Sequence, residues 1–278
     1  VYSNYMQIEG VTKIVGTKEG KTIGVLVGVH GNEVCGPKAL EQLLPALTID
    51  LGTVYFIYGN PRALDQNVRQ TEMNLNRAFK ATELLNEKDQ TSYEHKRALE
   101  LMGVLKQCEV LFDIHSSSTK NATPFIICEP HSFDIAKQLP VPILSYGWDA
   151  LEPGGTDHYM NTLGKKGICI ECGYHLDNAS VEKAQESILQ FLSVMGAIHG
   201  PVQSEFFDQR IIHVYSTYHT KVNFTPIREF ADFEVVKAQE EIGTDGETMI
   251  TADEESVIIF PRKLDVSNKE AFILGKEE

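Results

Sequence analysis

The stretch GVLVGVHGNEVCGPKAL (Gly24–Leu40) places a strand, a tight turn and the start of a helix next to one another. Its apolar run ends at His30, and Glu33 follows three residues later, with Gly and Asn between them. The segment 37–47 is predicted to be a helix because it begins with Pro, which is favoured in the first turn of helices. A strand that passes directly into a helix is the repeating unit of a parallel sheet covered by helices.

The same alternation of apolar runs and amphipathic segments continues to about residue 195. The predicted strands are short and rich in β-branched residues, and they lie at 25–29, 53–60, 109–115, 124–128, 141–146 and 167–172. The predicted helices lie at 37–47, 92–106, 131–139, 157–163 and 180–195. This order predicts an α/β fold in which a mixed, largely parallel sheet lies between helices.

The last part of the chain follows a different pattern. Strand-like runs at 210–216, 217–224, 233–238 and 255–261 are separated by Gly, Asp and Pro, without a long helical pattern. The acidic stretch 238–256 is expected to be a solvated loop or the edge of a hairpin. We therefore predict a boundary near residues 200–203, between a large domain at 1–200 and a small β-rich domain at 201–278.

The composition describes an ordinary globular protein that is strongly acidic. The 278 residues are 42% hydrophobic and 23% charged, with a net charge of −14. This charge argues against nucleic acid and anionic membranes as partners, because both bind clustered Lys and Arg. No apolar run approaches the ~18 residues of a membrane-spanning helix. Residues 1–10 lack a charged segment followed by an apolar one, so we expect a cytoplasmic protein.

The cysteines point to the same compartment. Five cysteines are too few, and odd in number, for a disulfide framework, which favours a reducing environment. Cys169 and Cys172 form a C-x-x-C motif, but it lies in a strand-like run and not at a helix N-terminus, where the dipole would lower the pKa of the thiol. We expect ordinary buried thiols.

Three predicted strands end in residues that can bind a metal or transfer a proton. His30 and Glu33 follow the first strand, His115 ends the run VLFDIH, and Glu171 lies near the end of GICIEC. Ligands gather at the carboxyl ends of parallel strands, so these side chains are expected to meet. Two imidazoles and one carboxylate are a ligand set of catalytic zinc, so His30, Glu33 and His115 are predicted to bind one Zn²⁺ per chain. Asp113, on the same strand face as His115, could orient its imidazole or pair with a basic group.

Glu171 is the predicted general base of this site. Hydrolysis by metal-bound water needs a group that takes the proton of the water and returns it to the leaving nitrogen. A carboxylate in so apolar a run must find a partner or change its pKa, which favours a functional role. The alternative, a strand-edge carboxylate exposed to water, stays open.

Arginine is concentrated in the segment NPRALDQNVRQTEMNLNRAF. It holds Arg62, Arg69 and Arg77, three of the seven arginines of the chain, beside Asn76. Because the planar guanidinium binds carboxylates and oxyanions through two parallel hydrogen bonds, we predict a small carboxylate-bearing substrate as the partner. A few exposed arginines in a long loop are the alternative.

Four motifs in this order, GVHGNE, GNPRAL…R…NLNRAF, DIHSSS and CIECGYH, resemble the aspartoacylase and succinylglutamate desuccinylase family. Members are zinc hydrolases of the carboxypeptidase fold that remove acyl groups from N-acylated amino acids. The resemblance covers about half of the chain. It implies that His30, Glu33 and His115 are the zinc ligands and that Glu171 is the general base.

The resemblance also implies roles for the loop and the last domain. Arg69 corresponds to the arginine that stabilises the oxyanion and polarises the carbonyl. Asn76 and Arg77 correspond to the pair that holds the substrate's carboxylate. The β-rich domain at 201–278 corresponds to the small C-terminal domain that partly covers the active-site cleft.

Two features depart from the family pattern. Aspartoacylases bind the second carboxylate with an Arg about ten residues before the base, where this chain has Asn161. The tyrosine of the C-terminal domain has no clear counterpart, and Val266 lies near its place. Lys165 or Lys166 could replace the missing cation. The motifs therefore predict the hydrolytic core and leave the substrate open.

Our main hypothesis is a zinc-dependent hydrolase, a deacylase that cleaves the amide bond of a small N-acyl amino acid or related carboxylate. A metallocarboxypeptidase acting on short peptides is the nearest alternative, because zinc, arginine and glutamate would serve there too. A non-catalytic metal-binding or small-molecule-binding protein on the same scaffold is the second. A homo-oligomer is compatible with all three.

Overall fold

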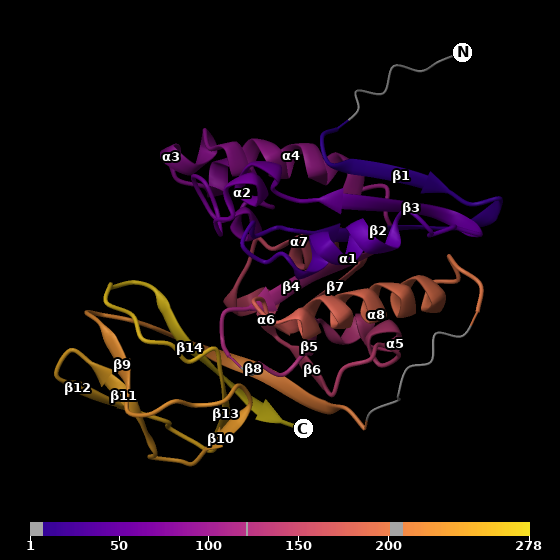
Figure 1. Cartoon of the computed structure of the whole chain (residues 1–278). Helices are drawn as coiled ribbons and strands as arrows, with labels where there is room; N and C mark the ends of the chain where they lie inside the picture. The colour runs from indigo at the N-terminus through magenta and orange to yellow at the C-terminus, as the bar shows by residue number, and fades with distance from the viewer. Residues whose placement is uncertain (1–7, 121, 201–207) are drawn as a thin grey trace.

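The carboxyl ends of parallel strands form one rim of a large sheet in the computed structural model, which describes residues 8–120, 122–200 and 208–278 (Figure 1). In spatial order the strands of this sheet are β1 (Val11–Val15), β3 (Leu51–Tyr58), β2 (Lys18–Val27), β4 (Val110–Ser117), β7 (Lys166–Tyr174), β5 (Phe125–Cys128), β6 (Ile143–Tyr146), β8 (Arg210–His219), β14 (Glu270–Glu277), β13 (Ser256–Ile259) and β10 (Glu234–Val236).

The strands that lead to the predicted site are parallel and apolar. β2 pairs in parallel with β3 and β4, and β4 pairs in parallel with β7. β1 and β5 run antiparallel to their neighbours β3 and β7, so the sheet is mixed. Every residue of β4 is buried, as expected for a strand covered on both faces. The fold class predicted from the sequence is confirmed.

Helices cover both faces of the sheet. Their bounds are α1 (Cys35–Leu43), α2 (Pro61–Gln66), α3 (Glu87–Gln90), α4 (Tyr93–Leu105), α5 (Phe133–Ala136), α6 (Trp148–Leu151), α7 (Thr156–Thr162) and α8 (Asn178–Val194), with short 3₁₀ helices η1 (Leu75–Arg77), η2 (Thr82–Leu84) and η3 (Pro130–Ser132). α1 and α8 share one core cluster with Val25 and Val27 of β2. Leu26, whose side chain points to the other face, packs in a second cluster with α4 and α7. None of the helices in the described ranges is long and apolar enough to cross a membrane.

The sheet continues into the last part of the chain. β8 pairs in parallel with β6 and antiparallel with β14, so residues from both predicted domains share one ladder of backbone hydrogen bonds. A separate antiparallel sheet contains β9 (Phe224–Pro226), β11 (Glu241–Asp245) and β12 (Thr248–Thr251), and Figure 1 shows it at the lower left, beyond β14. The predicted boundary at 200–203 falls mostly on residues 201–207, which lie outside the described residues, and the division into domains stays a prediction.

The predicted strand at 217–224 is wrong. β8 continues to His219, a turn follows, and β9 begins only at Phe224. The carboxylate of Asp245 accepts hydrogen bonds from the backbone N–H groups of residues 221–223, which holds them in the turn. The acidic stretch contains the hairpin β11–β12, in agreement with its interpretation as a hairpin edge.

Candidate active site

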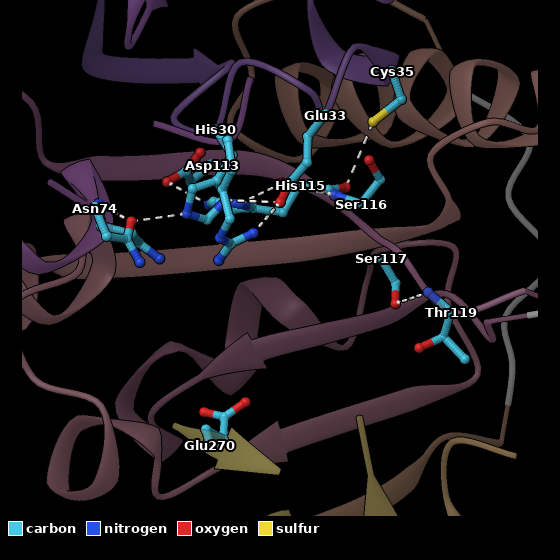
Figure 2. Close-up of polar contacts among 12 residues, drawn as sticks. His30, Glu33, Cys35, Asn74, Asp113, His115, Ser116, Ser117, Thr119 and Glu270 are labelled. Carbon is cyan, nitrogen blue, oxygen red and sulfur yellow. Dashed lines mark hydrogen bonds and ion pairs between the residues drawn. The ribbon is translucent and has the colours of Figure 1, made fainter. Parts of the chain in front are cut away.

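Three segments that are distant in the sequence meet at the carboxyl ends of β2, β4 and β7. His30 follows β2, and His115 lies near the end of β4. Glu171 of β7 is paired with His115 in the register of these two strands. Figure 2 shows His30, Glu33 and His115 with their side chains directed toward one another. The structure therefore brings together the residues that were predicted to converge.

Gly31 allows the turn after β2 to lie against the arginine-rich segment. A Cβ atom at this position would lie 2.1 Å from the backbone carbonyl carbon of Ala63 in α2, so only glycine fits. The N–H of Gly31 donates to the carbonyl oxygen of Arg69, and the N–H of Glu33 donates to that of His30. These contacts explain why a small residue stands between the two candidate ligands.

The carboxylate of Glu33 lies between the two imidazoles. Its Oε1 is 2.7 Å from His30 Nδ1, and its Oε2 is 2.9 Å from His115 Nδ1. All three residues are buried, and one ligand atom from each lies within 4.8 Å of the others. Burial alone would raise the pKa of Glu33, but the two histidines outweigh it and hold this pKa well below its usual value, so the carboxylate is ionised.

The tautomer of His30 follows from Asn74. Asn74 Oδ1 accepts a hydrogen bond from the backbone N of Asn76, so this atom is the amide oxygen, and it also lies 3.0 Å from His30 Nε2. An oxygen of this kind only accepts, so Nε2 carries the hydrogen and Nδ1 carries the lone pair. Burial lowers the pKa of His30, which keeps the ring neutral. Nδ1 has no hydrogen-bond partner among the described residues, although it faces Glu33.

Asp113 lies behind His115, as proposed from the strand alternation. Its Oδ2 is 3.1 Å from His115 Nε2, and it accepts a hydrogen bond of 2.5 Å from the hydroxyl of Thr156. Burial lowers the pKa of His115, but Asp113 and Glu33 outweigh this effect and raise it well above 6.5. Both imidazoles thus turn Nδ1 toward Glu33 and Nε2 toward an oxygen, which is the arrangement of metal-bound histidines with oxygen partners behind them.

Glu171 has no such partner. Its Oε2 is buried and makes no hydrogen bond to any described residue. Burial, followed by repulsion from Glu33, raises its pKa to about 8. The exposed strand-edge interpretation is therefore not supported, and a carboxyl group that titrates near neutral pH is suited to proton transfer.

The arginine-rich loop is fixed by a buried carboxylate that the sequence did not reveal. Glu94, in the first turn of α4, accepts hydrogen bonds from the backbone N–H groups of residues 71–73, from the hydroxyl of Thr71 and from the side chain of Asn60. The loop turns back toward the site as a result, and Arg69 Nη1 lies 3.0 Å from Glu33 Oε1. Half of the Arg69 side chain remains exposed and accessible to a substrate.

Asn76 and Arg77 lie on η1, close to the histidines. Asn76 Oδ1 accepts a hydrogen bond from the backbone N of Thr156, which leaves its NH₂ group as the donor for a ligand. Arg77 donates to the carbonyl oxygen of Asn76 and forms an ion pair with Glu152. Burial lowers the pKa of Arg77, and Glu270 of β14 partly offsets this, which places a carboxylate from the last part of the chain near this pair.

Several other residues lie away from this site. Arg62 pairs with Glu72 and is not part of the cluster. Lys165 donates to the carbonyl oxygens of Lys106 and Cys108, so it does not replace the missing cation. Lys166, the second candidate, pairs with the exposed Asp134. Asn161, at the position where aspartoacylases have the arginine, forms hydrogen bonds with Asp149 and with the backbone of Gly167. The five cysteines are buried and free, as expected.

A known protein family matches most of this chain. The family model described as the succinylglutamate desuccinylase/aspartoacylase catalytic domain matches residues 19–198, more than half of the chain. A probable aspartoacylase from Prochlorococcus marinus strain SARG is 30% identical over 152 residues, which are 49% of this chain and 48% of that protein. A probable aspartoacylase from a Nostoc species is 28% identical over 163 residues, 54% of each chain. The chain thus spans about half the length of the curated relatives it matches.

Solved structures share the fold over nearly the whole chain. A succinylglutamate desuccinylase from Vibrio cholerae superposes with a TM-score of 0.79 and 16% identity, covering 96% of this chain and 85% of that one. A product-bound ectoine utilization protein, EutE (DoeB), from Ruegeria pomeroyi superposes with a TM-score of 0.76 and 18% identity, covering 95% and 88%. At these identities the likeness concerns the fold alone.

Proposed function

The chain belongs to the succinylglutamate desuccinylase/aspartoacylase family, and on this premise we propose that it is a zinc-dependent deacylase that hydrolyses the amide bond of a small N-acyl amino acid. One observation carries the proposal. Buried ligand atoms of His30, Glu33 and His115 lie within 4.8 Å of one another, so a single cation could bind all three. Imidazole nitrogen and carboxylate oxygen are ligands of catalytic zinc, and these residues fit the ion.

Zinc held by His30, Glu33 and His115 would lower the pKa of a bound water and polarise the substrate's carbonyl group. Glu171, beside His115 in the sheet, would accept the proton of the attacking water and deliver it to the leaving nitrogen. Its raised pKa supports the second part of this role, because the carboxyl group can hold the proton between the two transfers.

The arginine-rich loop would bind the substrate. Arg69, half exposed beside Glu33, would stabilise the negative charge that develops on the carbonyl oxygen. The NH₂ group of Asn76 and the guanidinium of Arg77 would hold the substrate's carboxylate, for which Arg77 must exchange its ion pair with Glu152. A cytoplasmic location and a homo-oligomeric state are expectations, which cell fractionation and light scattering would test.

The experiment uses protein loaded with zinc and compares N-acetyl and N-succinyl amino acids with dipeptides and longer peptides. We expect turnover of N-acyl amino acids, and we expect Glu171→Gln to bind zinc normally while losing about 10²–10⁴ in kcat, the usual contribution of a general base. Glu182→Gln, an exposed position on α8, is the matched control.

Two results would contradict the proposal. Faster turnover of longer peptides would favour the carboxypeptidase hypothesis. Wild-type protein that retains no divalent metal after zinc loading would remove the basis of the enzyme itself.

A further inference from the structure

Phe125 lies beside the proposed general base, on the side away from His115. β7 lies between β4 and β5, and Glu171 of β7 is paired with His115 of β4 and with Phe125 of β5. Paired residues of antiparallel strands extend from the same face of the sheet, with Cβ atoms about 4.5–5.5 Å apart. The side chain of Phe125, which is only 1% exposed, is therefore a direct neighbour of the Glu171 side chain.

Packing has a larger part than hydrogen bonding in holding the carboxyl group of Glu171. Its Oε2 is buried and makes no hydrogen bond to any described residue, so this oxygen is not fixed by a donor. A base that takes a proton and returns it needs a defined position, because a displacement of about 1 Å can lower a rate by about 10²-fold. The neighbours that pack beside this side chain therefore matter for the reaction.

Three other aromatic rings surround Phe125, and together the four form what we call the aromatic cluster. Phe233 contacts Phe125 edge-on, with ring centroids 4.8 Å apart, and the centroid of Phe260 lies 5.8 Å from that of Phe125. Trp148 stacks on Phe125 with centroids 6.4 Å apart. Phe233 and Phe260 come from the last part of the chain, so segments distant in the sequence hold the neighbour of the base.

The two phenylalanines from the last part of the chain have an unusual backbone. Phe233 has a φ of 64° and Phe260 a φ of 54°, a left-handed conformation that is rare for bulky residues. The N–H of Phe233 donates to the carbonyl oxygen of Ile258, and the N–H of Phe260 donates to Asp232 Oδ1. Strained residues persist only where the surrounding structure imposes their conformation, and they gather at functional sites. Here the strain lies at two residues that contact Phe125.

We propose that Phe125 is a positioning residue for Glu171 and that Phe233 and Phe260 hold Phe125 in place. The proposal rests on the proposed function, which gives Glu171 its role as the base. It goes further, because it assigns the last part of the chain an effect on proton transfer that acts through packing alone. None of the three phenylalanines needs to contact the substrate.

Four alanine variants test the aromatic cluster. Phe125→Ala removes the ring beside the base, and Phe233→Ala and Phe260→Ala each remove a ring that holds it. Phe125→Leu keeps a large apolar side chain and is the conservative variant. Phe191→Ala is the matched control, because Phe191 is fully buried and stacks on Phe112 at the same centroid distance of 4.8 Å, in the core cluster on the other face of the sheet.

Kinetics of the zinc-loaded proteins, with the best N-acyl amino acid, is the first measurement. We expect kcat to fall about 10–100-fold in Phe125→Ala and about tenfold in Phe233→Ala and Phe260→Ala, because the base is misplaced. KM and zinc content should stay within about twofold of wild type, and Phe125→Leu should restore kcat to within about threefold. Phe191→Ala should lose stability in urea but keep the wild-type kcat.

A second measurement needs neither metal nor substrate. In protein labelled with ¹³C at the glutamate carboxyl groups, the signal of Glu171 is assigned by its loss in Glu171→Gln. We expect this signal to move in Phe125→Ala and Phe233→Ala and to stay in place in Phe191→Ala. A structural role alone would not distinguish these variants, because each removes a buried aromatic ring.

Three results would contradict specific parts of this reasoning. Wild-type kcat in Phe125→Ala and Phe233→Ala, or an equal loss in Phe191→Ala, would overturn the proposal. A loss confined to Phe125→Ala would overturn the role of the last part of the chain. Wild-type kcat in Glu171→Gln would instead contradict the proposed function.

Discussion

Glu33 and Glu94 are both buried carboxylates whose pKa is lowered, but their neighbours differ. The contacts of Glu94 described above are all with N–H or O–H donors, from the loop 71–73 and Asn60. Glu33 instead lies between the imidazoles of His30 and His115, and it also accepts from Arg69. The partners of Glu94 hold the loop in place, whereas the side chains around Glu33 are ones that can also bind a metal ion or a substrate. The comparison teaches that the partners of a buried charge distinguish a structural role from a binding role.

The strongest test of this comparison is Glu33→Ala. The binding free energy of structural zinc sites is about 10–16 kcal/mol and is divided among a few ligands. Loss of one ligand is therefore expected to weaken zinc binding on the order of 10³-fold. Metal content after dialysis against limiting zinc measures it. Glu94→Ala should still bind zinc while it remains folded. Equal zinc content in Glu33→Ala and wild type would show that Glu33 is not a ligand.

The reverse test is Glu94→Ala. It leaves buried donors without an acceptor, and we expect a loss of about 3–5 kcal/mol in the free energy of unfolding at pH 7. Because the folded pKa of Glu94 lies below 4.5, its contribution is complete above that pH and is lost as the pH falls through the lowered value. Urea unfolding of both proteins from pH 7 to pH 3 measures the difference. A difference within experimental error at pH 7 would refute the structural role.

Thr156→Val sharpens the comparison on the side of His115. Its hydroxyl donates to Asp113, which lies behind that imidazole, and hydrogen bonds to charged groups contribute about 1.5–3 kcal/mol. We expect a loss of this size in stability and about tenfold weaker zinc binding through Asp113. Thr162→Val, at an exposed position of the same helix, is the control. Unchanged zinc affinity in Thr156→Val would show that its hydrogen bond to Asp113 does not affect metal binding.

The smallest effect is expected at Asp232, a buried carboxyl group whose Oδ2 has no hydrogen-bond partner among the described residues. Its Oδ1 accepts from the backbone N of Phe260, and burial raises its pKa from 3.8 to about 6. The raised pKa means that ionisation costs stability above pH 6, a cost that vanishes as the pH falls toward 3.8. Asp232→Asn should therefore stabilise the protein by about 1 kcal/mol at pH 7–8 and not below pH 4. Thermal unfolding across this range checks the sign, and destabilisation at pH 8 would contradict it.

The sequence predicted the parts of the fold that repeat a regular pattern. The apolar runs of β2, β4 and β7 were found because buried parallel strands are continuously hydrophobic. β14 was missed, although residues 271–274 are buried, because Gly and charged residues interrupt the run on both sides. The end of β8 was misplaced because the turn after it depends on Asp245, more than twenty residues away.

For the site, the types of the residues indicated which of them are candidates, but the contacts between side chains could not be predicted. His30, Glu33, His115 and Glu171 could be predicted to converge because parallel strands end at one rim, although their roles stay predictions. Asn74 was hidden within the motif NLNRAF. Glu94 looked like any acidic residue in the first turn of a helix, and its partners are backbone groups that a sequence pattern cannot identify. Glu270, whose charge raises the pKa of Arg77, lies on a strand that the pattern did not reveal.

The position of β14 determines when its neighbouring strands can join the sheet during synthesis. β14 lies between β8 and β13 in the sheet, although β10 and β13 come before it in the chain. As the polypeptide leaves the ribosome, β10 and β13 cannot join the sheet until residues 270–277 have followed. Glu270 begins this strand, so Arg77 gains its late neighbour only when the nascent sheet closes. A newly made chain is thus expected to complete the surface around Arg77, which we propose binds the substrate, as one of the final steps of folding.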